Sequence, residues 1–371
     1  MTALPAPLPP DRKDNWQLIR AGRFPGMRAL AWSGDVLYAS RGYNLLRARI
    51  PRDALSMNLE WEHVGSFRPP FRRRMSRMSR LTARLFRDGF HALATLPSGV
   101  AVAAIPGAIV TLRPRESEFC VTHTITRGTR PLHITAVPNG PIFWGEYFDN
   151  AARDEVHIYA STDAGATWSV AYTFPKGAIR HVHNMVYDRW GDCLWILTGD
   201  YGDECRVLRA SCDFKSIEAV LQGNQQARAV ALVPTEEGVY FSSDTPLELN
   251  YVYRLDRGGN LSRLAPISSS SIYGCRVGDH VFFSTMVEPS DINRDREVRI
   301  FGAHTGGLTG KRADGDWRPL LAWKKDSWPM RFFQYGNAFL PDGDNQTPYL
   351  AVSTVAVEAD DCVMSLYALE G

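Results

Sequence analysis

The stretch Ser161-Thr162-Asp163-Ala164-Gly165-Ala166-Thr167-Trp168 decides how this chain folds. Its Asp163 can accept hydrogen bonds from backbone amides two residues further on, as aspartates in turns do. Its Gly165 can adopt the positive φ that a tight turn requires. Three further side chains fit the same turn, two by local hydrogen bonds and one by burying its ring between sheets: Ser161, Thr167 and Trp168. The octapeptide therefore predicts the turn of a β-hairpin.

Strands are expected on both sides of this turn, at 156–160 and 170–174, and similar strands recur along the chain. The recurrence has a period of about 45–50 residues, which is typical of propeller blades. A degenerate copy of the turn, Ser211-Cys212-Asp213-Phe214, falls at the equivalent place of the fourth unit. The most apolar strand of each unit is expected at 36–40, 100–104, 141–145, 193–198, 238–242, 281–285 and 349–353. The pattern predicts an all-β chain with a single β-propeller of seven four-stranded blades, and six blades are the alternative.

The chain is expected to form one domain. Residues 1–12 hold four prolines and are predicted to be a flexible tail, and residues 13–371 are predicted to be the propeller, with a basic insertion at 70–88. The segment Trp16-Gln17-Leu18-Ile19 is expected to supply the outer strand of the last blade. Such a strand closes the ring and removes the exposed edge of the sheet.

Composition narrows the class of protein. A formal net charge of +2 argues against a dedicated nucleic-acid binder. The chain begins without the charged start and apolar stretch of a secretory signal, and no apolar run approaches the ~20 residues of a membrane span. The six cysteines are scattered and none forms a C-x-x-C pair, so we expect them to be reduced and buried. These features together favour a cytoplasmic location.

The octapeptide 161–168 fits the Asp-box pattern S-x-D-x-G-x-T-W and resembles the turn that recurs in Asp-box (BNR-repeat) β-propellers, including sialidases. Arg23-Phe24-Pro25 also resembles, more loosely, the arginine-bearing motif that opens sialidase chains. The resemblance implies a propeller fold, a structural role for the box and an active site on the opposite face. Sialidases of this fold hold the substrate carboxylate with arginines and use a tyrosine–glutamate nucleophile pair with an aspartate acid. Related propellers are uronate-cleaving polysaccharide lyases, and others are non-catalytic.

Polar residues gather at the positions that meet on the face opposite the box, where the first strand of each blade begins and the second strand ends. We expect catalytic residues among Glu146, Tyr147, Asp200, Tyr201, His133 and His183, and substrate-binding residues among Arg180, Arg228, His91, Arg41, Tyr43 and Asp244. Glu288 occupies a similar position. The alternative is that these residues only satisfy strand ends around a wet channel.

The pair His181-x-His183 suggests a second kind of chemistry. Residues i and i+2 of a strand point the same way, so both imidazoles could face the propeller axis. With His91 or His133 they would make a three-nitrogen site for a divalent metal. They could equally serve as a general base and its orienting partner. No cofactor is required by the sequence.

The segment 72–87 holds seven arginines and no acidic residue. Met75, Met78, Leu81 and Leu85 are spaced as on one face of a short helix. An anionic partner is therefore expected, which could be an acidic sugar, a phosphate or a membrane surface, or the segment is a solvated basic loop. Nucleic acid is not expected, because aromatic residues are not interleaved with the arginines.

The sequence thus leaves three hypotheses for function. The first is a sialidase-like glycoside hydrolase that cleaves an acidic glycan or exopolysaccharide between two carboxylates, with Glu146 and Asp200 as candidates or with Tyr147 as nucleophile. The second is a polysaccharide lyase that neutralises a uronate carboxylate with an arginine or a metal and moves protons with histidine and tyrosine. The third is a non-catalytic propeller that binds a protein or a glycan.

Overall fold

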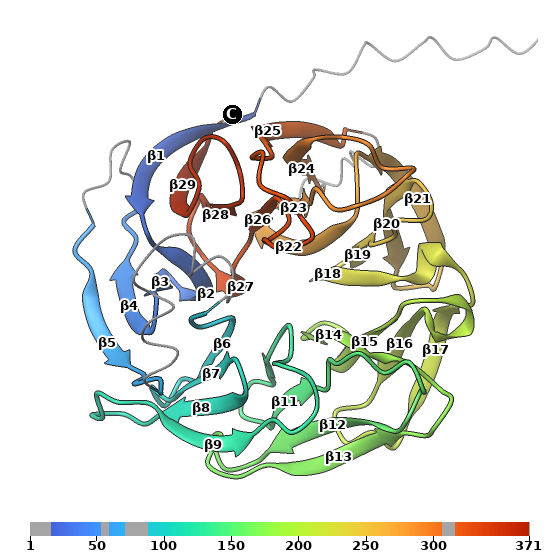
Figure 1. Ribbon diagram of the computed structural model, residues 1–371, viewed down its shortest axis with the longest axis horizontal. Coiled ribbons are helices and arrows are strands. Elements are labelled where there is room, and N and C mark those ends of the chain that lie inside the picture. The colour runs from blue at the N-terminus through green and yellow to red at the C-terminus, as the bar shows by residue number, and fades with distance from the viewer. Residues whose placement is uncertain (1–15, 53–58, 71–87, 306–315, 371) are drawn as a thin grey trace, which may run out of the picture.

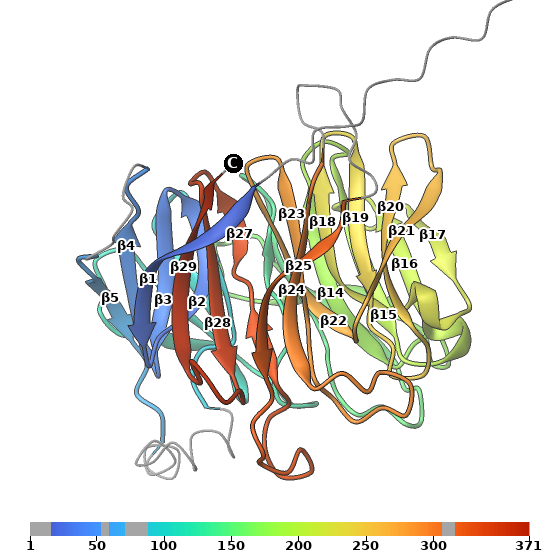
Figure 2. The same ribbon diagram turned by 90° about the horizontal axis from the view of Figure 1, so that it is seen from above.

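The structure is a computed structural model that describes residues 16–52, 59–70, 88–305 and 316–370. Over these ranges the strands form seven sheets arranged around a central axis, as Figure 1 shows. Seen edge-on, the strands run from one face of the disc to the other (Figure 2). The predicted tail and most of the predicted basic insertion, including 72–87, lie outside the described residues.

Seven blades of four main strands account for the ring, which confirms the predicted count of seven. The first blade comprises β2 (Arg28–Gly34), β3 (Val36–Arg41), β4 (Asn44–Arg49) and β5 (Glu62–Ser66). The second comprises β6 (Ala92–Thr95), β7 (Ala101–Ile105), β8 (Ala108–Leu112) and β9 (Cys120–Thr124). The third comprises β10 (Thr135–Ala136), β11 (Ile142–Gly145), β12 (Val156–Ser161) and β13 (Ser169–Phe174). The fourth comprises β14 (His181–Asp188), β15 (Cys193–Gly199), β16 (Arg206–Ala210) and β17 (Ile217–Gln222).

The fifth blade comprises β18 (Ala229–Thr235), β19 (Gly238–Ser243), β20 (Asn250–Asp256) and β21 (Leu261–Ile267). The sixth comprises β22 (Ser271–Val277), β23 (His280–Thr285), β24 (Glu297–His304) and β25 (Arg318–Lys324). The seventh comprises β26 (Asn337–Phe339), β28 (Tyr349–Val355), β29 (Val363–Glu370) and β1 (Gln17–Pro25). Two short 3₁₀ helices, η1 (Gly202–Glu204) and η2 (Gln225–Ala227), lie in connections. No helix of the described ranges is both long and apolar enough to cross a membrane.

The N-terminal strand closes the ring, as predicted. β1 pairs antiparallel with β29 over its whole length and forms the outer strand of the seventh blade, so the two ends of the chain share one sheet. The closing strand is longer than predicted and reaches Pro25. The sequence Arg23-Phe24-Pro25 therefore lies in this outer strand, where Arg23 bonds Asp360 at 2.9 Å.

One strand was not predicted. β27 (Asp342–Asn345) lies in the connection between β26 and β28 and pairs in parallel with β2, the innermost strand of the first blade. Figure 1 shows it near the centre of the ring. β27 thus brings Asp342 to the axis, where the sequence repeat alone places nothing.

Apolar side chains fill the spaces between neighbouring blades. Because alternate residues of a strand face opposite sides, Phe143 of β11 packs toward the fourth blade while Trp144 packs toward the second. Gly145 continues the side of Phe143, and a Cβ at this position would lie 2.5 Å from the Cβ of Val182. The third and fourth blades therefore approach each other closely only because residue 145 is glycine.

The octapeptide forms the predicted turn between β12 and β13. Asp163 Oδ1 accepts from the Thr167 amide at 2.9 Å and from the Ser161 hydroxyl at 2.8 Å, and Gly165 has φ +81°. Trp168 is half buried between the second and third blades and donates from Nε1 to Thr122. The Ser211 hydroxyl donates to Asp213 in the same way between β16 and β17.

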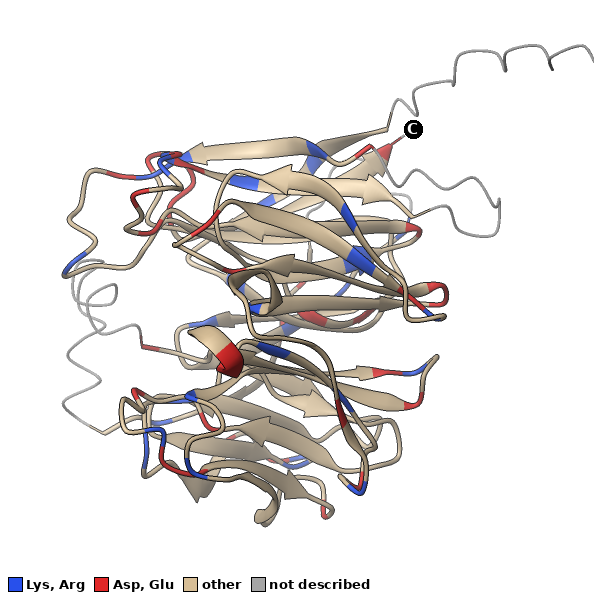
Figure 3. Ribbon diagram, turned by 90° about the vertical axis from the view of Figure 1, so that its right-hand side faces the viewer, with Lys and Arg blue, Asp and Glu red and all other residues tan. Residues whose placement is uncertain are grey.

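All six cysteines are free, as expected, but only Cys193 and Cys205 are buried and Cys120 is exposed. The expectation of general burial was wrong because Cys120 opens the outer strand β9, whose side chains face solvent more than those of inner strands. Charged residues of both signs are spread over the ribbon without a strong separation by sign (Figure 3).

Candidate functional site

We call the face at which the innermost strands begin the start face, and the face with the octapeptide turn the box face. On the start face of the fourth blade, His181 begins β14 and Asp200 follows the end of β15. The two strand ends meet because His181 pairs with Gly199 in the sheet. A β-bulge at His183, between the paired residues Val182 and Asn184, re-aims its side chain.

These residues form a compact cluster, which we call the triad: His181, His183 and Asp200. The Nε2 atoms of the two histidines are 3.1 Å apart, and Asp200 Oδ1 lies 3.2 Å from His183 Nε2 and 3.6 Å from His181 Nε2. In the described part of the chain, no other set of three histidine, cysteine or acidic side chains brings its donor atoms within 4.8 Å of one another. The expectation that His91 or His133 is the third member was therefore wrong, and the third member is Asp200.

The outer nitrogen of each imidazole is held by a backbone carbonyl. His181 Nδ1 lies 2.9 Å from the carbonyl oxygen of Phe148, in the third blade, and His183 Nδ1 lies 3.0 Å from that of Ala229, in the fifth. The rings are thus fixed from two different neighbouring blades. Both histidine side chains are at least nine-tenths buried.

Two predicted arginines border the triad. Arg180 Nη1 lies 3.2 Å from Asp200 Oδ2, and its Nη2 bonds Asp149. Arg228 Nη2 lies 3.4 Å from Asp200 Oδ1, and its Nε lies 3.5 Å from Asp244 Oδ2, beyond hydrogen-bond geometry. The Nε atoms of both arginines are buried and have no hydrogen-bond partner within the described part of the protein.

The environment shifts several pKa values in different directions. Burial opposes ionisation of Asp200, but the adjoining imidazoles and Arg228 outweigh it and hold the pKa of its carboxyl far below the usual range. Burial raises the pKa of Asp244 to about 6 despite Arg228, and burial also raises that of Glu288. Burial lowers the pKa of His183. The site therefore combines an ionised carboxylate with an acid that titrates near neutral pH.

Tyr147 reaches this cluster from the third blade. Its ring centroid lies 4.3 Å from that of His181 and 6.2 Å from that of His183. Burial raises the pKa of its phenol to about 12, with the charges of Asp200 and Asp244 adding to the effect. Tyr147 therefore stays protonated and can donate a proton or a hydrogen bond.

Glu146 does not join the triad. Its carboxylate accepts from Arg127 Nε at 2.9 Å and from the His157 amide at 2.8 Å. It lies on the side of its strand that faces the second blade, with Trp144, whereas the next residue, Tyr147, faces the fourth. The expected pairing of Glu146 with Asp200 was therefore wrong, because strand alternation separates them.

His133 and His91 also lie apart from the triad. His133 Nδ1 is 2.9 Å from Asp342 Oδ2, on the inserted strand β27. The carbonyl of His91 accepts from Arg28 at 3.3 Å, and Arg28 stacks on Phe339 at 3.8 Å. These contacts link the first, second, third and seventh blades around the axis rather than adding to the triad.

The remaining predicted residues divide between solvent and core. Tyr201 is 50% exposed, and the guanidinium of Arg180 lies 5.9 Å from its ring centroid. Arg41 is exposed at the end of β3. Tyr43 is 1% exposed and packs between the first and second blades, so the expected binding role was wrong for this residue.

Sequence reasoning missed two residues that support the cluster. Gln225 donates from Nε2 to the carbonyl of Asp200 at 2.9 Å, and Asp149 pairs with Arg180. Gln225 falls in the short helix η2, just before Arg228, and Asp149 follows β11 by four residues. Their positions in connections next to predicted site residues are the only signal that could have found them.

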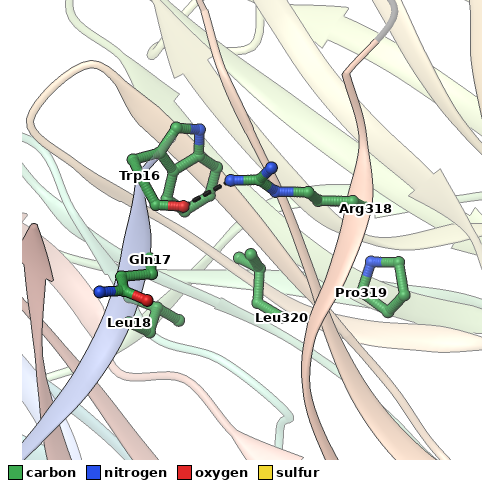
Figure 4. A pocket seen from close by; sticks show the side chains of 6 residues that line it. All are labelled: Trp16, Gln17, Leu18, Arg318, Pro319 and Leu320. Carbon is green, nitrogen blue, oxygen red and sulfur yellow. Dashed lines mark hydrogen bonds between the residues drawn. The ribbon is translucent and has the colours of Figure 1, made fainter. Parts of the chain in front are cut away.

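A groove lies elsewhere, on the outer edge of the ring. Its volume is ≈ 520 Å³, and Figure 4 shows its lining between β1 and β25: Trp16, Gln17, Leu18, Arg318, Pro319 and Leu320. The guanidinium of Arg318 lies 5.0 Å from the Trp16 ring centroid. No predicted site residue lines this groove, and it is formed by outer strands, so we do not assign the function to it.

Comparison with known proteins supports the fold. No protein-family model and no curated protein matches the chain. A chain of a solved structure described as the mitotic checkpoint complex is 11% identical, with a TM-score of 0.55 over 100% of this chain and 97% of that chain. The WD40 β-propeller domain of Doa1 is 8% identical, with a TM-score of 0.54 over 95% of this chain and 96% of that domain. The chain is thus a seven-bladed β-propeller, and at these identities the likeness concerns the fold alone.

Proposed function

We propose that this propeller is a carbohydrate-active enzyme that cleaves an acidic glycan at the triad, by a lyase-type elimination. The observation that carries the proposal is the convergence, on one face, of two imidazoles, a protonated phenol and two partly exposed arginines. The resemblance of the octapeptide to the Asp-box turn also implies an active site on this face, opposite that turn.

Arg180 and Arg228 are the groups suited to a sugar carboxylate. Their side chains are 21% and 15% exposed, so part of each guanidinium can be reached from solvent. A guanidinium binds a carboxylate through parallel hydrogen bonds, and it withdraws charge from the neighbouring carbon. This withdrawal acidifies the C–H bond next to the carboxylate, which is the bond that elimination must break.

In the proposed step a base removes the proton from the carbon beside the carboxylate. The electron pair of that C–H bond forms a carbon–carbon double bond, and the bond to the glycosidic oxygen breaks. Tyr147 gives its proton to the leaving oxygen, a role that suits a phenol with a pKa of about 12. Of the remaining catalytic candidates, His183 and Tyr201 lie near the arginines and can act as the base, whereas His133 is bound to Asp342.

Hydrolysis is the second candidate, favoured by one observation. Asp200 and Asp244 flank Arg228, and their environments push their pKa values in opposite directions. Such a division suits a general acid and an ionised carboxylate. In this alternative Asp244 replaces Glu146 in the predicted pair.

The test is turnover of polyuronates and of sialylated glycans by the purified protein. Elimination yields an unsaturated sugar that absorbs in the near ultraviolet, and hydrolysis yields reducing ends without that absorbance. Tyr147→Phe and Arg228→Lys are expected to lower kcat by about 10²–10⁴. The matched controls, Tyr187→Phe on the box face and Arg263→Lys on an outer strand, are expected to retain activity. Absence of both products with glycan binding intact would replace the proposal with a non-catalytic binding propeller.

A further inference from the structure

The atoms of the triad that face one another have no hydrogen to form a bond between them. A backbone carbonyl can only accept, so the Nδ1 atoms that face Phe148 O and Ala229 O each carry the hydrogen. A neutral imidazole has one N–H, which leaves a bare lone pair on each Nε2. The two Nε2 atoms nevertheless face each other at 3.1 Å, and Asp200 Oδ1 lies 3.2 Å from that of His183 and 3.6 Å from that of His181.

Three lone pairs thus converge on one small volume, inside a site where both imidazoles are nearly excluded from water. Lone pairs this close repel one another, and burial strengthens the repulsion because water cannot screen it. A positive charge between the three atoms removes the conflict. The charge is either an added proton, shared by two of the atoms, or a metal ion bound by all three.

The spacing fits a metal ion. The point equidistant from atoms separated by 3.1, 3.2 and 3.6 Å lies about 1.9 Å from each, and a small displacement out of their plane lengthens this to the ~2.0–2.1 Å of metal–imidazole and metal–carboxylate bonds. A shared proton needs only one short contact and gives no reason for the third atom to lie so near.

The surroundings are those of a supported metal site. Histidine ligands usually donate their other N–H to a carbonyl or carboxylate, which fixes the ring and the tautomer, and both rings here do so. Arg180 contacts Asp200 through Oδ2, whereas Oδ1 faces the imidazoles and lies 3.4 Å from Arg228 Nη2. The positive charge of Arg180 and Arg228 is offset by Asp149 and Asp244, with which they pair.

We propose that His181 Nε2, His183 Nε2 and Asp200 Oδ1 bind one first-row divalent transition-metal ion, such as Zn²⁺ or Mn²⁺. Two nitrogens and one oxygen favour such ions over Mg²⁺ and Ca²⁺, which prefer all-oxygen sites. Three protein ligands leave coordination positions for water or a substrate oxygen. The inference does not require the proposed function, but if both hold, His183 is a ligand and Tyr201 is the remaining base.

The test is metal binding by the full chain without any glycan. Protein stripped with a chelator is titrated with Zn²⁺, Mn²⁺ and, for comparison, Mg²⁺, and Co²⁺ is added to report coordination by its visible absorption. We expect one equivalent of Zn²⁺ or Mn²⁺ to bind, and Asp200→Asn and His183→Ala each to weaken binding by at least tenfold to a hundredfold. His133→Ala, which alters another start-face histidine, is the matched control and is expected to bind like the wild type.

Thermal unfolding separates lost binding from lost folding. Zn²⁺ is expected to raise the midpoint for the wild type and for His133→Ala but not for Asp200→Asn, even where the variant unfolds cooperatively without metal. Equal metal uptake by the wild type and Asp200→Asn, or none by the wild type, would overturn the inference and leave a proton at the triad. Activity on glycans does not enter this readout, so failure of the proposed function is distinguishable from failure of the metal site.

Discussion

Replacing Asp188 by alanine is expected to destabilise the propeller strongly while leaving the triad intact. Asp188 ends β14 on the box face, and its side chain is fully buried. It accepts from Trp195 Nε1 at 3.1 Å and from the amides of Trp190 and Gly191 at 3.1 and 3.2 Å. It also pairs with Arg257, which comes from the fifth blade, so one carboxylate ties two blades together.

The magnitude follows from what the substitution leaves behind. Alanine leaves the indole N–H of Trp195, two backbone amides and the guanidinium of Arg257 without this partner, and the Arg257 side chain is 32% exposed. Removing one partner of a buried ion pair costs about 3–5 kcal/mol, whereas removing the more exposed Arg257 costs about 1.5–3 kcal/mol. Burial opposes ionisation of Asp188, but Arg257 and Trp195 hold its pKa below the ordinary value. Its stabilisation is therefore present above the unfolded pKa of about 3.9 and is lost as pH falls through the lower folded pKa.

Urea unfolding of Asp188→Ala, Arg257→Ala and the double variant measures these terms. The double variant is expected to cost less than the sum of the single variants, because the two side chains share one interaction. Metal uptake at the triad is expected to persist wherever the single variant is folded. A loss of under 1 kcal/mol for Asp188→Ala, or exact additivity in the double variant, would refute the role assigned to this carboxylate.

Three further outcomes are expected. Asp163→Ala should remove the solvent-exposed hydrogen bonds of the octapeptide turn and lower the free energy of unfolding by about 0.5–1.5 kcal/mol in denaturant titration. An unchanged midpoint would contradict the turn geometry. Because the folded pKa of Asp244 is raised to about 6, the free energy of unfolding should fall as pH rises from about 4 to about 6. Asp244→Asn should flatten this fall and be more stable than the wild type by about 1–3 kcal/mol at pH 8. An identical pH profile for both proteins would show that Asp244 is not responsible. Gly145→Ala should lower the free energy of unfolding by about 1–3 kcal/mol, because the added Cβ must displace Val182. Val182 lies between the two histidines in the chain, so metal binding should weaken as well. Unaltered metal affinity in calorimetry would argue against coupling between this contact and the triad.

The architecture was predictable because each blade repeats the same local signals. The most apolar strand of every unit was predicted within a residue or two, and the closing role of the N-terminal segment followed from the need to remove a sheet edge. The inserted strand β27 was not predictable in this way. It reads Asp342-Gly343-Asp344-Asn345, a composition typical of a turn, and it is a strand only because β2 offers it an unpaired edge.

The bulge at His183 was equally hidden. The spacing H-x-H predicted two imidazoles on one side of a regular strand. In the structure the extra residue lets His181 reach back to a carbonyl of the third blade while His183 reaches forward to one of the fifth. The convergence of their Nε2 atoms depends on this three-blade arrangement, which no local pattern encodes.

The prediction that Glu146 pairs with Asp200 was wrong for a general reason. Gly145-Glu146-Tyr147 and Gly199-Asp200-Tyr201 are equivalent in the repeat, and equivalence suggested that both acids face one site. Within each pair, however, the two side chains point to opposite sides of the strand. Glu146 pairs with Arg127 on the side of the second blade, and Tyr147 contacts the triad from the other side. A site between two blades is therefore formed by the tyrosine of one motif and the acid of the equivalent motif in the next blade. Candidate residues in a propeller should be paired by the side of the strand they face rather than by their place in the repeat.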